Sequence, residues 1–205
     1  MYDKICLFGA GGHGRVVASQ IKMRWPQSSL CFADEQMACG TDVAGVSVSF
    51  NTPDEAVGWS IIVTIGDNKI RASRQQQAEE AAISMATFIA DEDRYFTTPP
   101  GKGSMVLSGA IVTSDASIGR GVIVNNGAII EHDSVIGDFC HLAPGSILAG
   151  GSVLGAHVFV GAGAQIVNQA QVADGTIIGA GSCVIKNIDE PGIYVGSPAR
   201  RIGPV

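Results

Sequence analysis

Aliphatic residues recur at every sixth position through the second half of the chain, without a break. Fourteen consecutive positions fit this period: Val106, Val112, Ile118, Val124, Ile130, Ile136, Leu142, Leu148, Leu154, Val160, Ile166, Val172, Ile178 and Val184. An α-helix repeats about every 3.6 residues and a strand about every 2, so neither element explains the pattern. A period of six predicts a repeat architecture of short strands.

Each six-residue unit has room for one short strand and one tight turn. The residue two places before the aliphatic one is usually small, and the residue after it is often glycine, as at Gly119 and Gly137. Three units close a triangular coil of about 18 residues, and such coils stack about 4.8 Å apart. We expect glycine because the corners turn sharply and the interior is narrow. The period leaves the handedness open, and the general crossover rule favours a right-handed coil.

The first hundred residues instead alternate between strand-like and helix-like segments. Strands are expected at 4–8, 29–34 and 61–68, and helices at 15–23 and 69–82. Strands alternating with helices predict a small parallel sheet. The Pro- and Gly-containing segment 97–103 marks the expected boundary. The chain is therefore predicted to have a small Rossmann-like α/β domain over residues 1–98 and a parallel β-helix over residues 104–205.

Composition and charge exclude several functions. The 205-residue chain is 46% hydrophobic and 16% charged, with a formal charge of −6. Residues 122–185 hold no Lys or Arg, which argues against nucleic acid as a partner. The five cysteines show no CxxC spacing, and neither a secretory signal nor a membrane-length apolar run occurs. We expect a soluble cytoplasmic protein with reduced thiols and no membrane insertion.

The β-helix carries one dense cluster of ionisable residues, in the segment IEHDSVIGDFCH. Its members are Glu131, His132, Asp133, Asp138 and His141. A histidine beside a carboxylate is the usual arrangement of a general base, because the carboxylate orients the ring and stabilises the imidazolium. A solvated turn with incidental charges is the alternative. Zinc would need His157 to join the other two histidines, but the three do not share a position in the repeat, so no metal is expected.

A glycine-rich turn, GAGGHG at residues 9–14, stands between the first strand and the first helix. This is the correct context for binding phosphate at a helix N-terminus. Asp34 follows the second strand, where dinucleotide-binding proteins place a ribose-binding carboxylate, so a dinucleotide is conceivable. The front half is too short for a complete dinucleotide-binding fold. The motif predicts a phosphate-bearing nucleotide and nothing narrower.

Several motifs in order make the whole chain resemble a bacterial enzyme family. GAGGHG, FADE, IGDN, IEHDSVIGDFCHLAPGS and VGSPARRIG together resemble the hexapeptide-repeat sugar acyltransferases, typified by sialic-acid O-acetyltransferases and the N-acetyltransferase that completes UDP-diacetylbacillosamine. The resemblance implies a left-handed β-helix, a homotrimer with active sites between subunits, and acetyl-CoA as co-substrate.

The resemblance also assigns roles to residues. His132 matches the catalytic base, and Asp133 matches the acid that raises its basicity, where the family usually has glutamate. Four residues are expected to contact acetyl-CoA or the oxyanion: His141, Gly150, Ala162 and Ala180. Six are expected to hold the nucleotide-linked sugar: Gly11, Gly12, His13, Asp34, Glu35 and Gly66.

The implied reaction is direct transfer of acetyl to the amino group of a UDP-linked amino sugar, without an acyl-enzyme. Cys140 and Cys183 occupy small-residue packing positions and show no sign of activation. Two alternatives stay open. One is O-acetylation of sialic acid or another sugar, and the other is a non-catalytic nucleotide-sugar-binding scaffold.

Overall fold

The computed structural model describes residues 2–205, and its front half is built on a four-stranded parallel sheet. The strands are β1 (Lys4–Phe8), β2 (Ser29–Ala33), β3 (Val48–Phe50) and β4 (Ser60–Val63), in the spatial order β3-β2-β1-β4. The helices are α1 (Gly12–Arg24) and α2 (Asn68–Glu80), with short 3₁₀ turns at Pro53–Glu55 and Glu92–Arg94. The predicted parallel sheet is confirmed, and β3 is an additional strand that the sequence pattern did not indicate.

Both faces of this sheet are covered, which explains the nearly continuous apolar strands. On one face, Ile5 and Leu7 of β1 pack with Val17 of α1. On the other face, Cys6 and Phe8 pack with Ala78 of α2. The front half therefore presents its polar loops, and not the sheet itself, to solvent.

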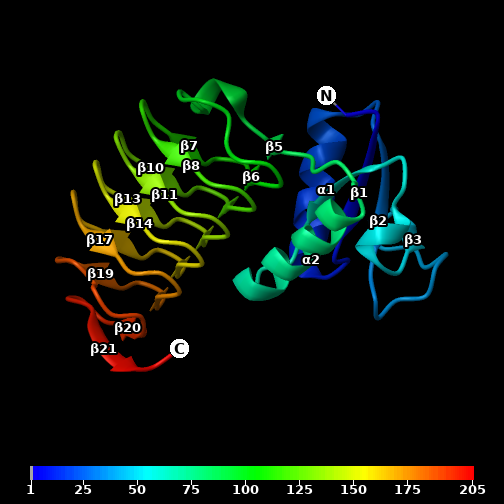
Figure 1. The fold of residues 1–205 in the computed structure, drawn as a ribbon. Coiled ribbons are helices and arrows are strands. Elements are labelled where there is room, and N and C mark those ends of the chain that lie inside the picture. Colours follow the sequence, from blue (N-terminus) through cyan, green and yellow to red (C-terminus); the bar gives the residue numbers. More distant parts are fainter. Residues whose placement is uncertain (1) are drawn as a thin grey trace.

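The second half is a triangular stack of two-residue strands (Figure 1). Its strands are β6 (Met105–Val106), β7 (Ile111–Val112), β8 (Ser117–Ile118), β9 (Ile123–Val124), β10 (Ile129–Ile130), β11 (Val135–Ile136), β12 (His141–Leu142), β13 (Ile147–Leu148), β14 (Val153–Leu154), β15 (Phe159–Val160), β16 (Gln165–Ile166), β17 (Gln171–Val172), β18 (Ile177–Ile178) and β19 (Cys183–Val184). All fourteen aliphatic residues of the six-residue period point inward and are at most 7% exposed. The predicted β-helix is confirmed, and it winds left-handed, against the general crossover rule.

The strands form three parallel sheets, one on each side of the triangle. The "docking sheet" (β6, β9, β12, β15 and β18) is extended by β5 (Phe88–Ile89) at one end and by β20 (Ile193–Val195) and β21 (Arg200–Gly203) at the other. The "second sheet" has the order β19-β16-β13-β10-β7, and the "third sheet" the order β17-β14-β11-β8. Paired residues are one coil apart, as in Ile129 with Ile147.

The corners show two different uses of glycine. Every sixth residue from Gly103 to Gly181 has a positive φ, between 56° and 77°, and nine of these fourteen are glycine. The glycines expected to make the turns, such as Gly137, have no positive φ. They are needed for another reason: a Cβ on Gly137 would lie 2.6 Å from the carbonyl carbon of Gly155 in the next coil. The sharp turns are therefore made at a different position of the six-residue repeat from the one that the sequence analysis expected.

The two halves share one core and one buried arginine. Met105 and Ile123 project from the docking sheet into the cluster that contains Ile5 and Leu7. Arg71 of α2 is fully buried and donates hydrogen bonds to main-chain carbonyls of both halves. Because β5 pairs with β6, the docking sheet begins before the expected boundary at 98–104, and the division into domains over residues 1–98 and 104–205 stays a prediction. Within residues 2–205, no helix combines the length and the apolarity that a membrane crossing requires.

Candidate active site

His132 and Asp133 lie at a corner of the β-helix, directly after β10. Asp133 has a φ of 60°, and its Oδ2 lies 2.8 Å from Nδ1 of His132. The hydrogen bond with Asp133 raises the pKa of His132 above its ordinary value, and the charges of Asp133 and Glu131 add to this effect. Since the carboxylate occupies Nδ1, the other ring nitrogen, Nε2, remains available as a base.

Gly150 lies directly beneath the His132 ring, one coil later in the stack. A Cβ on Gly150 would lie 2.6 Å from Nε2 of His132, so only glycine fits without moving the ring. Among residues 2–205, the Gly150 N–H donates no hydrogen bond. The structure thus brings together three predicted residues: a base, its orienting acid and an unoccupied main-chain donor.

His141 lies elsewhere in the same chain, on β12 of the docking sheet. It is only 8% exposed, with Nδ1 3.1 Å from the Gly66 carbonyl oxygen and Nε2 3.1 Å from the Asn125 side-chain nitrogen. A carbonyl can only accept, so Nδ1 carries the proton and Nε2 accepts from Asn125. Burial lowers the pKa of His141 to about 4, so the ring is neutral at neutral pH.

The Gly66 carbonyl oxygen accepts a hydrogen bond from His141 and a second one from Arg71. The Arg71 guanidinium donates to Gly66 (3.2 Å), and its Nη2 reaches the carbonyl oxygens of Phe139 (2.8 Å) and Cys140 (3.1 Å) just before His141. Asp67 caps the start of α2 by accepting from the Ile70 N–H at 2.9 Å. Arg71 therefore fixes the start of α2 against the docking sheet.

A pocket of about 500 Å³ opens in the front half, at the carboxyl ends of the parallel strands. All six residues predicted to hold the nucleotide-linked sugar line it: Gly11, Gly12, His13, Asp34, Glu35 and Gly66. The sequence reasoning missed Arg74, which also lines it. Burial, with the nearby charge of Arg71, lowers the pKa of His13 to about 4. We call this space the nucleotide pocket, after the ligand that the sequence analysis predicts for it.

Asp34 has a different local role from the ribose contact that a dinucleotide fold suggests. Its Oδ2 accepts from the Ala10 N–H and its Oδ1 from the Gln36 N–H, both at 2.9 Å. The carboxylate thereby holds the glycine loop in place. Within that loop, a Cβ on Gly14 would collide with the Gly9 carbonyl oxygen, so close packing of loop and helix requires glycine.

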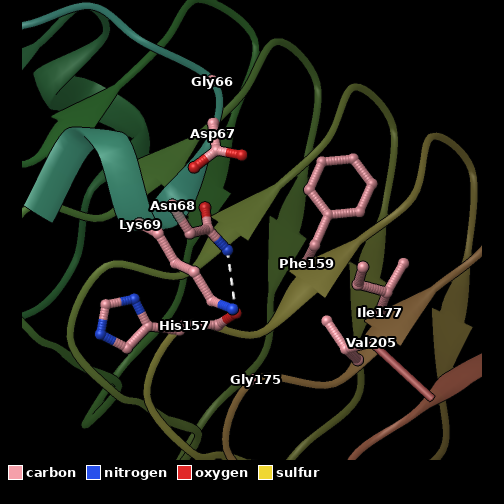
Figure 2. Close-up of a pocket in the computed structure, with 9 residues that line it drawn as sticks. All are labelled: Gly66, Asp67, Asn68, Lys69, His157, Phe159, Gly175, Ile177 and Val205. Carbon is pink, nitrogen blue, oxygen red and sulfur yellow. Dashed lines mark hydrogen bonds between the residues drawn. The ribbon is translucent and has the colours of Figure 1, made fainter.

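A second, more apolar groove of about 440 Å³ lies on the docking sheet (Figure 2). Phe159 and Ile177 form its floor, and Gly66 is common to this groove and the nucleotide pocket. Asn68 closes one side by donating to the His157 carbonyl oxygen at 2.9 Å. The predicted acetyl-CoA residues Ala162 and Ala180 do not line the groove, since they follow β15 and β18 at the opposite edge of the sheet.

The histidines considered for zinc are not brought together. His132 follows a strand of the second sheet, whereas His141 lies within the docking sheet. His157 stacks on Phe139, with ring centroids 5.5 Å apart. Across residues 2–205, no group of three or more His, Cys, Asp or Glu side chains has the arrangement of a metal site.

Acid is expected to destabilise the junction between the halves. His13 and His141 have pKa values lowered from 6.5 to about 4, so the unfolded state binds more protons as the pH falls through this window. The free energy of unfolding should decrease between pH 6.5 and 4, by up to about 3 kcal/mol per histidine. Chemical denaturation at a series of pH values measures this loss.

The matched control is His132→Ala, because the pKa of His132 is shifted upward and its contribution has the opposite sign. That variant should keep the full acid sensitivity. An acid sensitivity unchanged in the double variant His13→Asn/His141→Asn would contradict the assignment to these two rings.

Family models and solved structures match the two halves separately and together. Residues 4–78 match the PglD N-terminal domain, and residues 115–150 match the bacterial transferase hexapeptide (six repeats). The acetyltransferase domain of PglB from Neisseria gonorrhoeae is 28% identical, with a TM-score of 0.89, covering 98% of this chain and 100% of that one. The same domain has been solved in complex with acetyl coenzyme A. No curated protein sequence matches the chain.

Two further structures have the same fold. A variant of perosamine N-acetyltransferase from Caulobacter crescentus, solved with CoA and GDP-perosamine, is 29% identical, with a TM-score of 0.88 and coverage of 98% of this chain and 97% of that one. WeeI from Acinetobacter baumannii, at 22% identity and a TM-score of 0.70, covers 97% and 99% and shows the fold alone. The two family models and the structures at 28% and 29% identity show a hexapeptide-repeat acetyltransferase that is similar to bacterial sugar N-acetyltransferases.

Proposed function

We propose that the protein transfers acetyl from acetyl-CoA to the amino group of a UDP-linked amino sugar, with His132 as general base. The observation that carries this proposal is the His132–Asp133 pair above the unoccupied Gly150 N–H. The perosamine N-acetyltransferase relative, solved with CoA and GDP-perosamine, supports a nucleotide-linked amino sugar as acceptor. The choice of uracil as the base of the nucleotide is the more specific part of the proposal, because the ligand of that relative is a guanine nucleotide.

The proposed step needs only groups that this chain supplies. The sugar amine attacks the thioester carbonyl, a C–N bond forms and the C–S bond breaks. Nε2 of His132 takes the amine proton and delivers it to the departing CoA sulfur, so the proton count balances. Asp133 stabilises the imidazolium through its 2.8 Å hydrogen bond, and the Gly150 N–H donates to the developing oxyanion.

Direct transfer is favoured over an acyl-enzyme intermediate. Cys140 is fully buried, and burial raises the pKa of its thiol to about 12. Its Sγ donates to the Gly155 carbonyl oxygen at 3.0 Å, in the interior of the coil. A thiol in this setting is not a nucleophile at neutral pH. We also propose that the protein is cytoplasmic. Its five cysteines are all free, as expected in a reducing compartment.

The site is proposed to form between subunits of a homotrimer. His132 follows a strand of the second sheet, whereas the nucleotide pocket and His141 lie beside the docking sheet. The His132 side chain is 64% exposed and lines neither the nucleotide pocket nor the groove on the docking sheet. In the proposed trimer, a neighbouring subunit brings its nucleotide pocket to this side chain. Acetyl-CoA would lie along the docking sheet, from His141 towards Ala162 and Ala180.

A substrate panel tests the proposed function. The protein is incubated with acetyl-CoA and with UDP-, GDP- and dTDP-linked 4-amino sugars and sialic acid, and products are identified by mass. We expect one acetyl group to be added to a UDP-linked amino sugar, with release of one free thiol. Acetylation of sialic acid alone would replace the proposed acceptor, and no thiol release with any acceptor would favour a binding protein.

His132→Ala is expected to lower kcat about 10²- to 10⁴-fold, the usual contribution of a general base. Asp133→Asn should cost less, because asparagine keeps a hydrogen-bonding group. The rate should rise with pH as His132 loses its proton, at a pH above the ordinary histidine pKa because Asp133 raises it, and Asp133→Asn should move this limb to lower pH. Steady-state kinetics across pH measures both effects.

His141→Ala is the comparison variant, and it should act chiefly on the KM for acetyl-CoA. Full turnover in His132→Ala combined with no turnover in His141→Ala would mean that the two roles are reversed.

Light scattering is expected to give about three times the 21.1 kDa chain mass. If active sites are shared, two inactive variants should complement each other when refolded together: His132→Ala, which lacks the base, and Gly12→Trp, which blocks the nucleotide pocket. Activity should return in mixed trimers because some interfaces combine an intact base with an intact pocket. A fully active monomer would contradict both the trimer and the shared site.

A further inference from the structure

The nucleotide pocket has an unusual charge balance for a site that takes a diphosphate. Its lining includes two carboxylates, Asp34 and Glu35, and one guanidinium, Arg74, which leaves one net negative charge. His13 adds no charge at neutral pH, because burial lowers its pKa to about 4. A nucleoside diphosphate brings two or more negative charges of its own, so the pocket needs a cation that can turn towards it.

The two carboxylates have different hydrogen-bond partners. Both oxygens of Asp34 accept hydrogen bonds from main-chain N–H groups, those of Ala10 and Gln36. Those donors stabilise its charge and keep it within the glycine loop. Glu35 has a different partner, namely Arg74, with 2.8 Å between Oε2 and Nη2.

The Glu35–Arg74 ion pair is weak enough to be exchanged. Its side chains are 41% and 30% exposed, and an ion pair of that exposure contributes about 0–1 kcal/mol. Arg74 stands one helical turn after Ile70, which also lines the pocket, so the backbone of α2 directs both side chains to the same wall. The guanidinium carbon lies 5.8 Å from the centre of the Phe8 ring, and Nη1 donates to Gln77 at 3.1 Å.

We propose that Arg74 binds the diphosphate of the nucleotide-linked sugar, and that Glu35 holds the guanidinium at the pocket wall until the nucleotide enters. This inference rests on the proposed function. The planar guanidinium matches two phosphate oxygens and binds them more strongly than an exposed carboxylate. The main-chain N–H groups at the start of α1, from Gly12, face the diphosphate from the other side. Glu35, once released, is free to accept hydrogen bonds from ribose hydroxyls.

Titration calorimetry with UDP, GDP and dTDP tests the inference on the full-length protein. Arg74→Gln should weaken binding of whichever nucleoside diphosphate the wild type prefers at least tenfold, and Arg74→Lys should weaken it less, because lysine keeps the charge but loses the paired donors. Glu35→Gln should weaken binding less than Arg74→Gln does, because glutamine can still hydrogen-bond the ribose and the guanidinium remains to bind the diphosphate. The KM for acetyl-CoA, measured with each variant, should stay within twofold and reports an intact fold.

Arg15→Gln is the matched control, because it removes the same charge beside the same loop. Nη2 of Arg15 lies 3.9 Å from the Cβ position of Gly12, yet Arg15 does not line the pocket. Its affinity loss should be below threefold. An equal loss in both arginine variants, or wild-type affinity in Arg74→Gln, would overturn the role of Arg74 and leave the proposed function standing. Failure of the wild type to bind any of the three nucleotides would overturn both.

Discussion

The β-helix depends on one main-chain requirement, a left-handed backbone conformation at every sixth residue. This conformation turns the chain so that strands of successive coils pair, as where the Ile129 N–H donates to the Ser146 carbonyl oxygen at 2.9 Å. Nine of the fourteen corners satisfy the requirement with glycine, which adopts it without steric cost. The five corners without glycine are Asp115, Asp133, Phe139, His157 and Gln169.

The corner at Asp133 shows how this constraint serves chemistry. A non-glycine residue in this conformation costs about 1–2 kcal/mol, and aspartate tolerates it better than most residues. The turn lets adjacent side chains meet, so that Asp133 reaches Nδ1 of His132 without help from another element. Gly150, one coil later, then leaves the space that the ring occupies. The His132–Asp133 pair and its surroundings are thus products of the repeat itself.

Features that repeat, or that are close in sequence, could be predicted from the sequence. The period of six identified fourteen inward aliphatic residues, because each coil repeats the same packing problem. The family resemblance grouped the glycine loop with residues after β2 and β4, and these residues do line one pocket, where the carboxyl ends of the parallel strands meet. The reason for the glycines at positions such as 137 could not be predicted, because it is a contact between coils.

Contacts between the two halves also could not be predicted from the sequence patterns. Arg71 and Arg74 lie in a helix whose composition indicates only an exposed surface, yet Arg71 is fully buried. Its partners are carbonyls about 50 to 70 residues away in the chain, which no local period reports. The environment of His141 depends on the same docking, because Gly66 reaches its ring only when α2 sits on the sheet.

The partners of Arg71 on the β-helix have a consequence for how this architecture diversifies. They are the main-chain carbonyls of Gly121, Phe139 and Cys140, and every amino acid supplies such a group. The part of the attachment that Arg71 supplies is therefore insensitive to side-chain changes at these three positions, whereas the packing of Met105 and Ile123 is not. The coils beneath Arg71 can change their side chains and still offer it the same three acceptors.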